Sequence, residues 1–156
     1  MTIRFIPMDE ATAAHLRNGG PDAYGNAPEK RISDGAGVRC RRCMDFVARG
    51  EPYLVAAWRP FTALHAYAET GPVFLHADPC SPAPLSGALP AFLESPAYVL
   101  RGYDAGERIV YGTGDVVERG SILARAEELL AMPEIEAVHV RSARNTCYHC
   151  KAVREA

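Results

Sequence analysis

The clearest helical pattern in the chain lies between Gly120 and Met132, where apolar side chains recur every three or four residues. This spacing places them on one face of a helix, and Pro133 ends the pattern because proline cannot continue a helix. A shorter helix is predicted over residues 11–17, since acidic residues precede it and glycines that favour a helix end follow it. We therefore expect one main helix and one short N-terminal helix.

Short apolar runs with β-branched and aromatic residues occur several times outside the two helices. Their length and composition predict strands at residues 2–8, 53–58, 72–76, 97–103, 108–117 and 135–140. The segment Asp104–Glu107 separates two of these runs and is typical of a hairpin turn. Strands joined in this way, with one main helix, predict an α+β fold with a mostly antiparallel sheet of five or six strands. A β-α-β crossover over residues 109–140 is the alternative that the pattern leaves open.

The length of the chain fits one domain. Its 156 residues lie within the range of roughly 100–200 residues that a single hydrophobic core usually organises. Residues 19–37 are rich in Gly, Pro, Asn and Asp and poor in large apolar side chains. We therefore expect a single domain over residues 1–156, with a long loop over residues 19–37.

The charge balance narrows the classes of partner. Seventeen Lys and Arg residues stand against 19 Asp and Glu residues, which gives a formal net charge of -2. This balance argues against a protein that coats nucleic acid or an anionic membrane. No apolar run approaches the roughly 20 residues of a membrane span, and the first residues carry no secretory signal pattern. We expect a cytoplasmic protein, for which a small-molecule ligand stays open and no macromolecular partner is identified.

Five cysteines are present, and four of them form two Cys-x-x-Cys pairs, at positions 40 and 43 and at positions 147 and 150. In a reducing compartment this spacing points to metal or redox chemistry rather than to disulfides. Two such turns can place four thiolates around one zinc ion in a closed, structural site. The sequence therefore predicts a zinc site formed by Cys40, Cys43, Cys147 and Cys150.

A further stretch, from His76 to Cys80, directly follows a predicted strand. Side chains at the end of a strand often point into a functional site, so His76 and Cys80 are candidates for additional metal ligands. A second interpretation needs no metal, because a histidine beside a cysteine favours the reactive thiolate. An enzyme or a redox sensor would then use Cys80 or Cys147, near His76 or His149 respectively.

Several motifs occur together in this chain: Cys40–Cys43, Glu69–His76 with Cys80, Leu100–Tyr103, Arg108–Gly114 and Asn145–Cys150. In this combination they resemble a small bacterial family, the domain of unknown function 1203 (DUF1203). The resemblance runs from about residue 38 to residue 154. It implies one intact bacterial domain of this size, and it assigns no catalytic role to any residue.

These observations lead to one functional expectation and one alternative. We expect a small zinc-binding module whose four-cysteine site is structural, because four thiolates leave no open position for water. The alternative is an enzyme or sensor that uses a reactive cysteine without metal. The third interpretation is a protein that binds a ligand on its sheet, with thiols that are merely buried as small apolar groups.

Overall fold

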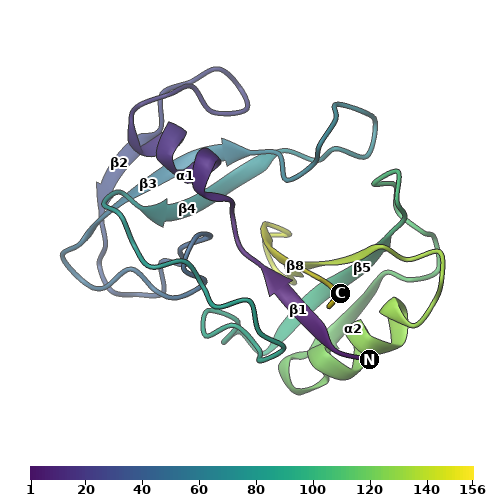
Figure 1. Ribbon diagram of the computed structural model, residues 1–156. Helices are drawn as coiled ribbons and strands as arrows, with labels where there is room; N and C mark the ends of the chain where they lie inside the picture. Colours follow the sequence, from purple (N-terminus) through teal and green to yellow (C-terminus); the bar gives the residue numbers. More distant parts are fainter. The chain divides into compact units, whose positions relative to one another are not determined.

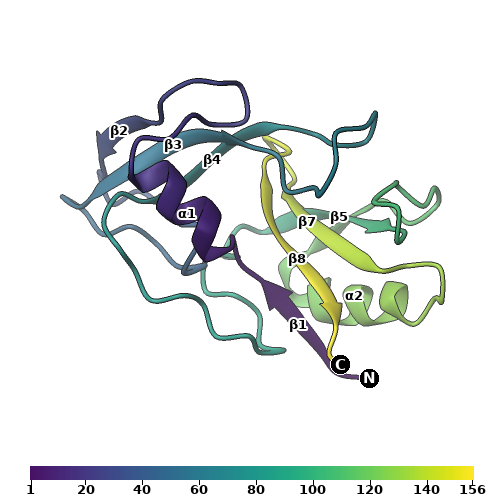
Figure 2. The same ribbon diagram turned by 45° about the horizontal axis from the view of Figure 1, so that its top comes forward.

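A computed structural model describes all residues, 1–156. The chain divides into two compact units, and each is described by itself. One unit contains residues 7–64 and 68–84, and the other contains residues 1–6, 65–67 and 85–156. Each unit has its own β-sheet, and the strands of both are labelled in Figures 1 and 2. The single domain expected over residues 1–156 stays a prediction.

The first unit is a three-stranded antiparallel sheet with one helix. Its elements are α1 (Glu10–Arg17), β2 (Glu29–Ile32), β3 (Pro52–Trp58) and β4 (Gly71–His76), and the strand order is β2-β3-β4. Side chains alternate across β3 and β4, so that Leu54 and Leu75 are buried. They belong to one core with Ala13 and Leu16 of α1, and Figure 2 shows the helix lying across this sheet.

Both ends of α1 follow from its sequence. The Asp9 carboxylate accepts a hydrogen bond from the backbone N–H of Thr12 at 2.9 Å, which satisfies a donor that the first turn leaves unpaired. At the other end Gly19 adopts a φ of 81°, a conformation that glycine tolerates without steric cost. The predicted N-terminal helix is therefore confirmed, beginning one residue earlier than expected.

One strand of this sheet lies in the segment where the sequence predicts only a loop. Residues 29–32 form β2, which pairs with β3 from Glu29 opposite Val55 to Ile32 opposite Pro52. All four side chains of β2 are exposed, so the strand shows no alternation of apolar and polar residues. Its pairing with β3 is a tertiary contact that local periodicity does not reveal.

The second unit is a five-stranded antiparallel sheet with one main helix. Its strand order is β1-β8-β7-β5-β6. The elements are β1 (Ile3–Ile6), β5 (Ala97–Tyr103), β6 (Asp115–Glu118), a 3-10 turn (Arg119–Ser121), α2 (Ile122–Leu130), β7 (Ala137–Ser142) and β8 (Tyr148–Arg154). The apolar face of α2 is buried, as the helical spacing predicts, through Ile122, Ala126, Leu129 and Leu130.

The helix α2 connects two strands that flank β5. Both β6 and β7 pair with β5 in antiparallel fashion, so they run parallel to each other and the helix carries the chain across β5. The expected strand over residues 108–117 is interrupted, because the chain turns at Gly112 with a φ of 92°. Only Ile109 keeps an isolated bridge to Tyr103, and β6 begins at Asp115.

The α+β class with antiparallel pairing is confirmed, and the eight strands divide into sheets of five and three. The main helix is also confirmed, with its α-helical part from Ile122 to Leu130 and a 3-10 turn before it. No helix of the chain combines the length and the apolar character needed to cross a lipid bilayer.

Candidate metal centre

Three cysteines and one histidine come together in the first unit. Cys40 and Cys43 lie in the segment before β3, His76 is the last residue of β4, and Cys80 follows four residues later. Their Sγ and imidazole nitrogen atoms all lie within 4.8 Å of one another. Cys40 is fully buried, and the other three residues are partly buried. The group has the number and type of ligands that hold a zinc ion.

Two of the separations within this group match those of a tetrahedral site. The Sγ atoms of Cys40 and Cys80 are 3.9 Å apart, and Cys43 Sγ lies 3.5 Å from His76 Nδ1. Bond lengths of about 2.3 Å to sulfur and about 2.05 Å to nitrogen place tetrahedral ligands about 3.8 Å (S to S) and about 3.6 Å (S to N) apart. The two measured pairs therefore need little movement to coordinate one ion.

The turn that carries Cys40 and Cys43 closes without a glycine. Met44 adopts a φ of 54°, which is the left-handed conformation. This allows the backbone N–H of Met44 to donate to the Cys40 carbonyl at 3.0 Å, and the N–H of Cys40 to donate to the Asp45 carbonyl at 2.8 Å. A methionine in this conformation gives no signal in the sequence, although it supplies the sharp turn that zinc-binding pairs need.

Strand β4 holds this turn in place. The backbone N–H of Arg41 donates to the Phe74 carbonyl at 2.9 Å, and Cys40 forms an isolated parallel bridge with Phe74. The backbone N–H of His76 also donates to Cys40 Sγ at 3.3 Å. The cysteine turn is therefore attached along the edge of the strand that ends in the histidine ligand.

Both ring nitrogens of His76 have a partner. Nδ1 faces Cys43 Sγ, and Nε2 lies 3.4 Å from a carboxylate oxygen of Glu51. In metal sites a histidine commonly coordinates through one nitrogen while the other donates to a carboxylate, which fixes the orientation of the ring. Glu51 is in the position of such a carboxylate.

Arg17, the last residue of α1, contacts the other side of the group. Its Nε donates to the His76 carbonyl at 3.0 Å, and a terminal nitrogen donates to Cys80 Sγ at 3.1 Å. Three thiolates around a divalent ion carry a net charge of about -1, and the guanidinium of Arg17 offsets that charge. The helix therefore supplies a cation whose hydrogen bonds also fix the segment that bears Cys80.

The three thiols differ in acidity. The pKa of Cys40 is well below its ordinary value, because its sulfur accepts hydrogen bonds from the Cys43 thiol and from the backbone of Cys43 and His76. The pKa of Cys43 is raised by its hydrogen bond to Cys40 and by burial. Burial and the charge on Cys40 raise the pKa of Cys80, although Arg17 opposes this effect. Of the three thiols Cys40 is thus the one that loses its proton most readily, and a metal ion would displace the protons from the other two.

The second cysteine pair lies in the other unit of the chain. Cys147 directly precedes β8 and Cys150 is buried within it. His149 is also buried, with its ring against Phe92 and Tyr98 and its Nδ1 donating to the Cys147 carbonyl at 3.0 Å. Coordination of one ion by Cys40, Cys43, Cys147 and Cys150 stays a prediction. His76 and Cys80, which the sequence suggested as additional ligands, lie beside the first pair.

The burial and contacts of these cysteines also test the alternative in which the protein uses a reactive cysteine without metal. The thiol with the lowered pKa, Cys40, has no exposed surface, so its thiolate is closed to a substrate. Cys80 is more accessible, but its pKa is raised and His76 directs its two nitrogens toward Cys43 and Glu51. The row of contacts from Cys43 through His76 to Glu51 fits both a ligand set and a thiol beside its general base.

Comparison with known proteins gives one match. The family model described as "Protein of unknown function (DUF1203)" matches residues 37–154, a range that includes all four clustered ligands. No curated protein and no solved structure matches the chain. The match covers well over half of the 156 residues, and the chain therefore belongs to the DUF1203 family.

Proposed function

We propose that this protein is a zinc-binding module in which Cys40, Cys43, His76 and Cys80 hold one structural zinc ion. The observation that carries the proposal is the convergence of these four ligand atoms within 4.8 Å, at separations suited to a tetrahedron. Thiolate and imidazole ligands favour zinc over magnesium or calcium, which prefer oxygen. Four protein ligands close the coordination shell, so the ion has a structural role rather than a catalytic one.

The position of the group within its unit explains what the ion would stabilise. The ligands come from the turn before β3, from the end of β4 and from the segment after β4, while α1 contributes Arg17. Cys40 also belongs to the apolar core of this unit, with Cys43 and Cys80 packed against it. A single ion would therefore join three separate segments at the border of one small core.

The metal content of the protein, purified without a metal-affinity tag, tests this proposal directly. We expect about one zinc ion per chain by elemental analysis. Cys43→Ser and Cys80→Ser should each lose most of the bound zinc, because either change removes one of four ligands. Cys147→Ser is the matched control, since it removes a partly exposed cysteine of the other unit, and it should keep the wild-type zinc content.

Two results would contradict the proposal. Loss of zinc from Cys147→Ser together with retention in Cys80→Ser would favour the four-cysteine site instead. Absence of metal, with rapid alkylation of Cys80 or Cys147 at neutral pH, would favour the reactive-cysteine alternative. In a zinc-bound site the three coordinated thiols resist alkylation until a chelator is added.

A further inference from the structure

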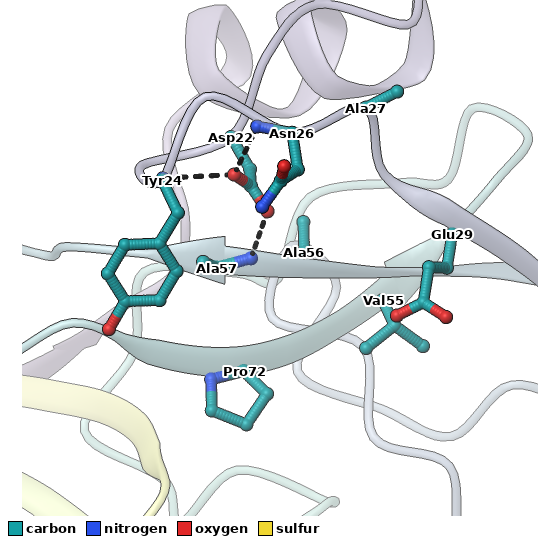
Figure 3. A pocket seen from close by; sticks show the side chains of 9 residues that line it. All are labelled: Asp22, Tyr24, Asn26, Ala27, Glu29, Val55, Ala56, Ala57 and Pro72. Carbon is teal, nitrogen blue, oxygen red and sulfur yellow. Dashed lines mark hydrogen bonds between the residues drawn. The ribbon is translucent and has the colours of Figure 1, made fainter.

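A cavity of about 360 Å³ lies in the first unit, away from the four metal ligands. Figure 3 shows its walls: the segment that carries Asp22, Tyr24 and Asn26 on one side, and strands β3 and β4 with Val55 and Pro72 on the other. This volume falls within the range of about 300–1,000 Å³ that is typical of small-molecule sites. None of the interactions described for the metal centre uses this cavity.

The wall formed by residues 22–26 is held rigidly against β3. One oxygen of the Asp22 carboxylate accepts from the backbone N–H of Tyr24 at 2.9 Å and of Asn26 at 3.0 Å. Its other oxygen accepts from the N–H of Ala57 at 2.9 Å, and the Ala57 carbonyl accepts from Ala23 at 3.0 Å. A wall fixed in this way loses little freedom when a ligand binds.

Tyr24 stands at one end of this cavity. The residue is 65% exposed, yet its hydroxyl donates to the Thr70 carbonyl at 3.1 Å, which holds the ring in one orientation. An exposed aromatic ring that is fixed at its tip offers a flat apolar surface to the apolar body of a ligand.

The charge of the lining is negative. Asp22 and Glu29 line the cavity, and no Lys or Arg is among the lining residues. Burial alone would raise the pKa of Asp22, but hydrogen bonds from the backbone of Ala57, Asn26 and Tyr24 have the larger combined effect. The pKa is therefore lowered, and the carboxylate is ionised at neutral pH.

Glu29 stands at the end of the cavity opposite Tyr24 (Figure 3), where its Oε1 pairs with exposed Arg31 at 3.0 Å. Such a surface pair is weak, and an incoming cation can compete for the carboxylate.

We infer that this cavity binds a small organic cation, an ammonium group joined to a flat apolar body. The apolar body would pack against Tyr24, Val55 and Pro72, and the ammonium group would lie at the Glu29 carboxylate. Strand β3 gives a length scale for such a ligand, because Ala57, which is bonded to the segment beside Tyr24, lies two residues from Val55, which is opposite Glu29. Two residues of a strand span about 6.6 Å, comparable with an aromatic ring joined to an ammonium group by two carbons.

A titration followed by amide resonances tests this inference on the full chain. The probe is phenethylammonium, and hydrocinnamate is the matched anion of similar size and shape. We expect saturable shifts at the amides of Tyr24, Asn26 and Ala57 with the cation, and binding at least about fivefold weaker with the anion, because the lining is acidic.

Variants separate the two parts of the site. Tyr24→Ala removes the packing of the apolar body and Glu29→Gln removes the charge that faces the ammonium group, so each should weaken binding of the cation by about two- to fivefold. Tyr24→Phe keeps the ring and should retain most of the affinity, while Glu134→Gln, at an exposed position of the other unit, should leave binding unchanged.

The inference is overturned if the anion binds as well as the cation, or if shifts do not saturate by about 10 mM, beyond the affinity of weak small ligands. It is also overturned if neither Tyr24→Ala nor Glu29→Gln changes the titration. These outcomes are independent of the metal content of the protein, so they leave the proposed zinc site untouched.

Discussion

Individual residues around the metal ligands carry much of the chemistry proposed for this protein. Glu51 and Arg17 coordinate nothing, but they contact His76 Nε2 and Cys80 Sγ respectively. Outer contacts of this kind commonly raise metal affinity, because they fix the orientation and charge of the ligands. The candidate metal centre therefore includes Glu51 and Arg17 beside its four proposed ligands.

The carboxylate of Glu51 offers a prediction at this scale. Glu51→Gln keeps the size of the side chain but removes its charge, so the zinc affinity should fall by about tenfold or more. Competition against a chromophoric chelator measures this change. Glu94→Gln, which neutralises an exposed carboxylate of the other unit, should keep the wild-type affinity. Equal affinities for Glu51→Gln and the wild type would show that Glu51 does not position His76.

At the scale of the elements, strands bring together side chains that are distant in sequence. His139 of β7 lies between rings from its two neighbours: it stacks on Tyr103 of β5 at 4.0 Å, and it meets the edge of Tyr148 of β8 at 5.1 Å. Burial lowers the pKa of His139 well below its ordinary value, and the nearby charges of Arg141, Lys151 and Arg101 act in the same direction. The histidine is thus held neutral within the five-stranded sheet.

This neutral histidine predicts a dependence of stability on pH. Below pH of about 6.5 the unfolded chain binds a proton at His139 that the folded chain does not, so the fold loses stability as the pH falls. His139→Phe keeps an aromatic ring and removes this proton. Relative to wild type, the variant should gain up to about 1.4 kcal/mol for each pH unit below that value.

Urea unfolding at a series of pH values between about 7 and 5 measures this difference. Protonation of the metal ligands affects both proteins alike, so the difference between them isolates His139. A constant difference between wild type and His139→Phe across this range would mean that His139 is not held neutral.

At the scale of the whole molecule, the two units differ in the size of the side chains that form their hydrophobic cores. The unit with the metal ligands has roughly 75 residues, and its core has few large side chains, Met8, Leu16, Leu54 and Leu75 among them. In units of about this size the hydrophobic core rarely contributes more than about 3–5 kcal/mol, so a metal ion would add substantially to the stability. The five-stranded unit buries larger side chains, including Phe5, Phe92, Tyr98 and Tyr103.

Removal of the metal should therefore affect the two units unequally. After treatment with a strong chelator, we expect amides of β3 and β4 to exchange their hydrogens much faster, because binding of zinc is coupled to folding of its site. Amides of β7 and β8 should keep most of their protection. Hydrogen exchange measured by mass spectrometry distinguishes these strands, and Cys43→Ser should show the fast exchange without chelator. Unchanged protection of β3 and β4 would argue against a structural metal.

Local sequence patterns predict much of the fold. Apolar spacing predicts the main helix, the acidic residues and glycines that flank residues 11–17 predict the first, and apolar runs mark most of the strands. The sequence also predicts Cys40 and Cys43 as a ligand pair, as it does Cys147 and Cys150, because a spacing of three residues lets both thiols of a pair face one ion. These features depend on neighbours along the chain, and so they can be predicted without the fold.

Tertiary structure decides the features that depend on distant neighbours. The exposed strand β2 exists only through its pairing with β3, and the left-handed Met44 closes a turn for which the sequence shows no glycine. The choice of partners for Cys40 and Cys43 is of the same kind. Cys80, His76 and Cys147 are all plausible ligands by residue type, and only the hydrogen bonds that attach the cysteine turn to β4 bring His76 and Cys80 to it. Ligand chemistry is a property of single residues, whereas coordination requires their atoms to meet at one point, which only the folded chain determines.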